Sequence, residues 1–205
     1  MDDWSTLNSI EVDALREIGN IGAGNAATSL AQLLNRKINM SVPRAGLVPF
    51  DEIVHLVGNE EDLVACVDTR VTGPAPACVL FILQGDSAYY LVDMLLGRQS
   101  GETTEMGEME RSTLTEVGNI LTGSFLAAFA QMTQLKFIPE VPALALDMLG
   151  AVLTTALISS GYFSEQVLVI ETTLFNEHDS ISGHFFLVPQ EGALKTILKA
   201  VGLSS

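Results

Sequence analysis

The chain contains an internal repeat that limits how it can fold. Glu17-Ile18-Gly19-Asn20 is followed 99 residues later by Glu116-Val117-Gly118-Asn119. In both copies a proline lies 23 residues after the asparagine, at Pro43 and at Pro142. When the two segments from Glu to Pro are aligned without a gap, ten of the 27 positions are identical. A repeat of this length predicts two related halves.

The predicted elements follow the same order, α-β-α-β-β-α, in each half. We expect one domain over 1–205, with repeats at 5–97 and 108–203 joined by a polar linker at 98–107. Strands that follow each other closely along the chain favour antiparallel pairing. The predicted fold class is therefore α+β, with two pseudo-twofold-related repeats forming one mainly antiparallel sheet layer covered by helices.

The boundaries come from apolar periodicity and from turn residues. In the first half we expect helices over 5–34, 50–57 and 86–96, and strands over 37–42, 63–71 and 77–83. In the second half we expect helices over 108–133, 143–159 and 192–201, and strands over 136–141, 166–175 and 181–188. Pro43 should end a strand, Asp86 or Ser87 should cap a helix, and Gly97 should stop it.

The charge and the apolar runs exclude several classes of partner. A net charge of −15 argues against binding to nucleic acid or to anionic lipid, which both need a basic footprint. The uncharged runs 18–35 and 117–135 contain polar residues throughout, and the run 148–164 is too short to span a bilayer. We therefore expect no membrane insertion. The acidic start of the chain, which lacks an apolar signal region, predicts a cytoplasmic protein.

The cysteines and histidines do not indicate a metal site. Cys66 and Cys78 lie in apolar strand-like runs and are expected to be buried free thiols. The three histidines are scattered without ligand spacing, so we expect no metal held by this chain. Residues 22–27 match the dinucleotide pattern G-x-G-x-x-A, but a helix and not a strand is predicted before them, so the match is read as coincidental.

A helical wheel separates the motif residues of the first helix from its apolar side. Ile10, Ala14, Ile18 and Ile21 fall on one side of the wheel, which is expected to face the core. The opposite side should face solvent; it carries Asp13, Glu17, Asn20, Gly24 and Ala27. A small residue one turn beyond the asparagine would let the backbone of another protein approach closely.

Glu and Asn at this spacing suggest a particular chemistry because both recur in the second repeat. One such pair alone is typical of a solvated helix face. Asn in mid-helix is a poor helix former, so its repetition indicates a role outside packing. A carboxylate can anchor a cation of a partner, and an amide can orient a water molecule. Orienting water is a large part of catalysis in phosphoryl hydrolysis. The sequence has no P-loop, so the phosphoryl group would arrive on another molecule.

The two motifs, each with its proline, resemble those of the CheC–CheX–FliY phosphatases of bacterial chemotaxis, and most closely those of the CheC branch. The resemblance covers nearly the whole chain. CheX proteins keep one motif per chain, FliY proteins carry a further domain, and FliM-like switch proteins lack the Glu/Asn pair. The chain keeps two motifs and is too short for the FliY domain.

The resemblance implies hydrolysis of the aspartyl phosphate on the response regulator CheY. By this analogy Asn20 and Asn119 align the attacking water, and Glu17 and Glu116 each hold a regulator lysine. The Mg²⁺ belongs to CheY, and this chain holds no cofactor.

The family also implies a second partner, the receptor deamidase CheD, and the chain is expected to act as a monomer. Asp147 lies at the position where family members dock CheD through the start of a helix. The alternative reading of Asp147 is a helix N-cap.

A different class of function stays open. The chain would then be a non-catalytic adaptor that binds phosphorylated CheY and regulates CheD. A structural role in the flagellar switch is disfavoured by the retained Glu/Asn pairs.

Overall fold

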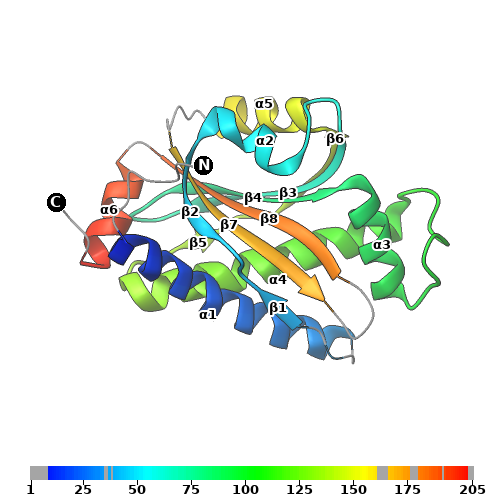
Figure 1. The fold of residues 1–205 in the computed structure, drawn as a ribbon, viewed down its shortest axis with the longest axis horizontal. Helices are drawn as coiled ribbons and strands as arrows, with labels where there is room; N and C mark the ends of the chain where they lie inside the picture. Colours follow the sequence, from blue (N-terminus) through cyan, green and yellow to red (C-terminus); the bar gives the residue numbers. More distant parts are fainter. Residues whose placement is uncertain are drawn as a thin grey trace.

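An eight-stranded curled sheet lies in the middle of the structure, with helices on both of its faces (Figure 1). This computed structural model describes residues 9–34, 37, 39–160, 166–175, 180–190 and 192–202. Among these residues every strand pair is antiparallel. The predicted fold class is confirmed.

The elements follow the predicted order, with one extra strand segment in each half. The first half contains α1 (Ser9–Leu34), β1 (Asn39–Ser41), β2 (Ala45–Pro49), η1 (Phe50–Glu52), α2 (Ile53–Val57), β3 (Leu63–Thr72), β4 (Ala77–Gln84) and α3 (Gly85–Leu96). The second contains α4 (Glu108–Thr133), β5 (Ile138–Pro139), β6 (Ala143–Met148), α5 (Leu149–Ser160), β7 (Gln166–Phe175), β8 (Ser180–Pro189) and α6 (Ala193–Ala200). Residues 5–8 of the first predicted helix lie outside the described residues.

Each half supplies an edge strand to the other half. The sheet order is β1-β7-β8-β4-β3-β5, with β2 also on β7 and β6 also on β3. Thus β1 and β2 of the first half pair with β7 of the second, while β5 and β6 of the second pair with β3 of the first. The two halves meet where β4 pairs with β8, and this arrangement is the predicted pseudo-twofold.

The repeated proline marks a bulge in each edge strand. Ser41 pairs with Thr173 and Ala45 pairs with Ile170, so four steps along one strand match three along its partner. In the second half, Pro139 pairs with Val71 and Ala143 pairs with Asp68, which again sets four steps against three. The extra residue lies near Pro43 and near Pro142. Because proline cannot donate to a strand ladder, a bulge on an edge strand accommodates it.

The pairing beyond each proline was not predicted. β1 ends at Ser41, just before Pro43 as expected, but the chain resumes pairing in β2 and, in the second half, in β6. The helix expected over 143–159 is wrong in its first six residues, which form β6. Ala143-Leu144-Ala145-Leu146 consists of strong helix formers. The segment is nevertheless a strand, because it pairs with β3 and because Leu144 and Leu146 are less exposed than the residues that alternate with them.

The bounds predicted for α3 agree with the structure within one residue, but the predicted capping residue is wrong. The residue at the N-cap position is Gln84, which makes no capping hydrogen bond through its side chain, and Asp86 and Ser87 lie inside the helix. Gly97 adopts a left-handed conformation at φ 70° and terminates the helix, as glycine does most easily.

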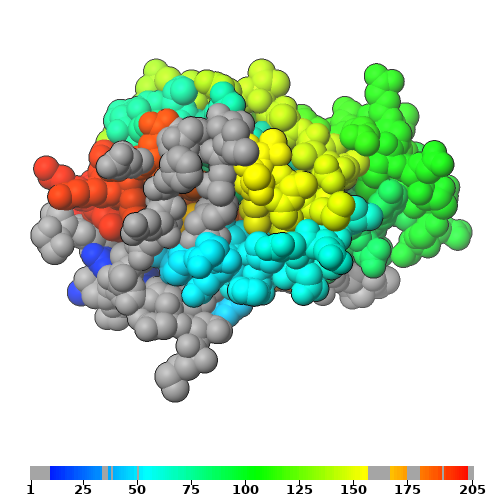
Figure 2. Space-filling view, turned by 90° about the horizontal axis from the view of Figure 1, so that it is seen from above, coloured from blue at the N-terminus to red at the C-terminus, as the bar shows by residue number. Residues whose placement is uncertain are grey.

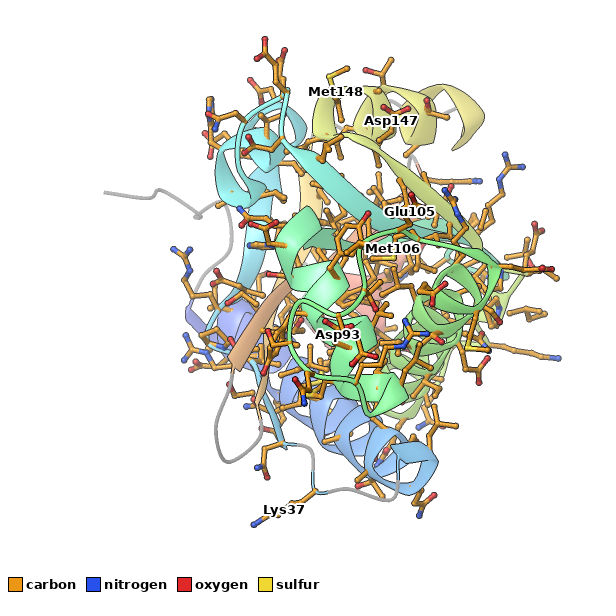
Figure 3. All side chains as sticks on the ribbon, turned by 90° about the vertical axis from the view of Figure 1, so that its right-hand side faces the viewer. Lys37, Asp93, Glu105, Met106, Asp147 and Met148 are labelled. Atoms are coloured by element: carbon orange, nitrogen blue, oxygen red, sulfur yellow. The ribbon has the colours of Figure 1, made fainter. Side chains whose placement is uncertain are left out.

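The linker at 98–107 is anchored to α3 by Asp93 (Figure 3). The buried Asp93 carboxylate accepts the N–H of Gly101 at 2.8 Å and the N–H of Thr103 at 2.9 Å. Burial by itself raises the pKa of Asp93, but the hydrogen bonds from Thr103 and from the loop backbone outweigh it and lower the pKa below its ordinary value.

Helices α1 and α4 lie side by side across one face of the sheet and run in opposite directions (Figure 1). They approach closely: a Cβ on Gly22 of α1 would lie 2.4 Å from Cδ1 of Phe125 on α4. Phe125 in turn contacts Phe185 of β8 with ring centroids 4.4 Å apart. The core below the two helices is closed at one end by α6 and at the other by α3.

Helices α2 and α5 cover the opposite face, and Figure 2 shows them next to each other in cyan and yellow. Cys66 and Cys78 are buried in this second core as free thiols, which confirms the expectation from the sequence. Burial raises the pKa of both thiols, and the Asp68 carboxylate raises it further. Among the described helices, none combines the length and the apolar character needed to cross a bilayer.

The close seating of α4 on the sheet yields a stability prediction. A Cβ on Gly118 would lie 2.5 Å from Cγ1 of Val67, whereas one on Gly123 would meet open space. We expect Gly118→Ala to lower the free energy of unfolding by about 1–3 kcal/mol through overpacking. Gly123→Ala should raise it by about 0.5–1 kcal/mol, because alanine is the better helix former. Urea unfolding of both variants measures the difference; equal stabilities would show that Gly118 is not needed for packing.

Candidate functional site

Both Glu/Asn pairs project into solvent from the outer side of the α1–α4 layer. Glu17 and Asn20 are exposed on α1, and Glu116 and Asn119 are exposed on α4. The members of each pair are three positions apart in the sequence, so they lie about one helical turn apart on one face. The outward orientation predicted for the first helix is confirmed for Asp13 and Gly24 as well. The inward assignment of Ile10 is wrong: its side chain is 68% exposed, and seven residues of α-helix place it only about 20° from Glu17.

The two middle residues of each motif explain why the outer two face solvent. Ile18 and Val117 are almost completely buried. The following glycine packs against the sheet: a Cβ on Gly19 would lie 3.2 Å from Val42, and one on Gly118 would lie 2.5 Å from Val67. Glycine in mid-helix is otherwise a weak helix former. Their recurrence in both repeats was the signal that they are packing positions.

A second glycine in each repeat leaves space beside the asparagine. Gly24 and Gly123 both lie four residues after the motif Asn, and a Cβ built on either meets no atom within 4 Å. These two glycines are therefore not required by packing within the chain. A partner backbone can approach the helix there more closely than it could beside a larger side chain.

The four motif side chains are not engaged within the part of the chain that the structure describes. No hydrogen bond or ion pair of Glu17, Asn20, Glu116 or Asn119 side chains occurs there. Nearby on α1, Arg16 Nη1 lies 3.9 Å from Asp13 Oδ1. An exposed carboxylate and amide without internal partners remain available to a cation and a water of another molecule.

Asp147 lies on the other side of the sheet, beside Met148 at the start of α5 (Figure 3). The N-cap reading is wrong, because Asp147 belongs to β6 and its Oδ1 accepts the N–H of the adjacent Met148 at 2.8 Å. The first N–H groups of α5 are satisfied by backbone carbonyls instead: Leu149 donates to Asp62 at 2.9 Å and Gly150 to Glu60 at 3.0 Å.

Asp147 also lines a cavity of about 280 Å³ between β6 and α5. Its other polar lining residues include Asp68 and Thr155, and most of the rest are small apolar residues. Because the thiol pKa values are raised, Cys66 at this cavity stays protonated near neutral pH and is a poor nucleophile. Among the described residues, no three His, Cys, Asp or Glu side chains gather so as to hold a metal ion.

We call Glu17 with Asn20 on α1, and Glu116 with Asn119 on α4, the two Glu/Asn rows. Their geometry limits the chemistry that they can perform without another molecule. Neither row contains a nucleophile beside a base, and none of the four motif residues lines the cavity beside α5. Each row is exposed on a helix that packs against the sheet. Such a surface suits insertion of one amide into the site of another protein, where it can position a water molecule.

Comparison with known proteins finds the same family that the two motifs resemble. A model described as the CheC-like family matches residues 10–47 and 109–146, the two segments that contain the motifs. The CheY-P phosphatase CheC of Bacillus subtilis (strain 168) is 36% identical over 208 residues, covering 100% of both chains. The flagellar motor switch phosphatase FliY of the same organism is 32% identical over 118 residues, covering 58% of this chain and 31% of that protein.

Solved structures show the same fold. FliY of Thermotoga maritima matches with a TM-score of 0.75 at 20% identity, covering 98% of this chain and 100% of that one. The FliM middle domain of H. pylori matches with a TM-score of 0.70 at 10% identity, covering 95% of this chain and 99% of that one.

Proposed function

The chain belongs to the CheC-like family, and we propose that it is a phosphatase that hydrolyses the aspartyl phosphate of the chemotaxis response regulator CheY. The observation that carries the proposal is the pair of exposed Glu/Asn rows on α1 and α4, within a chain similar over its full length to a CheY-P phosphatase. Two rows in one chain give two sites for the regulator.

In this mechanism the regulator supplies the phosphoryl group and its Mg²⁺, and this chain supplies orientation. Asn20 or Asn119 enters the regulator's site, where its amide holds a water in line with phosphorus. Glu17 or Glu116 pairs with a lysine of the regulator and fixes the angle of approach. The open space at Gly24 and Gly123 allows the regulator backbone to come close to the helix.

The non-catalytic adaptor is the competing function, and turnover separates the two. With phosphorylated CheY in large excess over this chain, a phosphatase releases many phosphates per chain. An adaptor binds the phosphorylated regulator and leaves the rate of phosphate release at the rate of the regulator alone. The assay needs only the two purified proteins.

Removal of the asparagine amides tests the water-orienting role. We expect Asn20→Ala and Asn119→Ala each to lower the phosphatase rate, and the double substitution nearly to abolish it, because loss of positioning lowers the rate on the order of 10²-fold per site. Asn25→Ala, an exposed amide on α1 outside the row, is the matched control. Wild-type phosphate release by the double variant, with an unchanged circular dichroism spectrum, would contradict the assignment.

Charge reversal of the glutamates tests the lysine contact. Glu17→Lys and Glu116→Lys should weaken binding to phosphorylated CheY, most at low salt, because like charges then meet with little screening. A titration of the double reversal at two ionic strengths measures the effect. Glu52→Lys with Glu61→Lys makes the same change in net charge at exposed positions elsewhere. If both double variants bind equally well at low salt, the salt-bridge role is excluded.

We further propose that Asp147 contributes to binding the deamidase CheD. Its carboxylate is exposed, lines the cavity beside α5 and lies on the sheet face opposite the Glu/Asn rows. One chain could then hold CheD on one face and CheY on the other.

Because Asp147 does not cap α5, its charge can be removed with little effect on stability. Asp147→Asn should weaken the CheD complex while leaving the melting temperature and CheY-P hydrolysis unchanged. The control is Asp86→Asn, an exposed carboxylate on α3. A pull-down with CheD beside a thermal melt decides the matter; full CheD binding by Asp147→Asn would remove the residue from that interface.

A further inference from the structure

Two large apolar side chains are exposed at equivalent positions of the repeats. Ile10 in the first turn of α1 is 68% exposed, and Met109 in the first turn of α4 is 62% exposed. They are 99 residues apart, the same spacing that separates the two Glu/Asn motifs. Each of them therefore lies the same number of residues before its own motif.

Helix geometry puts each apolar side chain on the same face as its motif. Ile10 lies seven residues before Glu17, and Met109 lies seven residues before Glu116. Seven residues of α-helix correspond to about 10 Å along the axis and a rotation of about 20°. Each row thus runs from an exposed apolar side chain through Glu and Asn to the open glycine.

A second exposed apolar pair shows that exposure alone does not define the row. Leu33 is 55% exposed and Met132 is 37% exposed, and they too are 99 residues apart. They lie 16 residues after the motif Glu, which rotates them by about 160° from it on the helix. This pair faces away from the row and offers a matched comparison.

We propose that Ile10 and Met109 bind the same phosphorylated receiver domain that the Glu/Asn rows engage, each acting as an apolar anchor for its own site. The inference rests on the proposed function and adds to it the residues that set affinity. One exposed Glu–Lys pair contributes little to affinity and leaves the partner free to rotate about it. A buried apolar contact two turns away restrains that rotation, so the amide can enter the partner's site at a defined angle.

The experiment isolates one site at a time. Ile10→Ser is placed in an Asn119→Ala background, where only the first site is intact, and again in an Asn20→Ala background. In the first background we expect KM for CheY-P to rise about tenfold with kcat nearly unchanged, because an apolar contact made equally in the bound and transition states is lost. In the second background KM should not change. Met109→Ser should show the opposite dependence.

Leu33→Ser and Met132→Ser are the controls, and neither should alter KM in either background. A binding titration with phosphorylated CheY gives the same comparison without turnover. Absence of catalysis in the wild-type chain, with weaker binding by Ile10→Ser, would refute the phosphatase and keep the anchor. Unchanged KM and affinity for Ile10→Ser would refute the anchor and keep the phosphatase. A shift of the free chain's oligomeric state, with unchanged affinity for CheY-P, would assign the side chain to a self-contact and overturn the proposal.

Discussion

The contact between the motif glycine and the sheet determines what each long helix presents to solvent. Gly118 sits so close to Val67 that a single additional carbon would collide with it. With the glycine and the preceding apolar residue held inward, the flanking Glu and Asn have only the outer side of the helix left. The four-residue motif is thus both a packing device and a functional one. Its two inner positions fix how the helix is rotated about its axis, and this rotation makes the two outer positions face solvent.

The exchange of edge strands extends this constraint from one helix to the pair. Because β1 and β2 lie on β7 while β5 and β6 lie on β3, neither half has a complete sheet of its own. The shared sheet therefore holds α1 and α4 on one surface, where Gly22 of α1 packs closely against Phe125 of α4. Both Glu/Asn rows then lie on the same side of the molecule. Because α1 and α4 run in opposite directions (Figure 1), the two rows do so as well. Asp147 lies on the other side of the sheet, away from both rows.

The sequence predicted well those elements whose stability is local. Helix α4 begins and ends where its periodicity indicated, and β7 does as well. The failures occur where pairing between the halves prevails over local preference. Segment 143–148 consists largely of helix formers but becomes β6 because β3 requires a neighbour. The Glu/Asn positions were found through the repeat. The inward assignment of Ile10 was wrong, because seven residues of α-helix place it only about 20° from Glu17.

The difference between the two sites also changes meaning once burial is known. In the sequence the copies diverge most visibly just after the motif, at Gly22-Ala23 and Leu121-Thr122. All four of these residues are buried, so this divergence adjusts the packing of α1 on α4 and does not reach a partner. The exposed divergence lies before the motif: the first site carries Asp13 near Arg16, and the second carries the uncharged Ser112 at the position of Asp13. An additional carboxylate one turn from Glu17 makes the local potential more negative, and Arg16 opposes it. This exposed ion pair is a difference between the two helices that another molecule can meet, whereas the buried residues just after the motif are not.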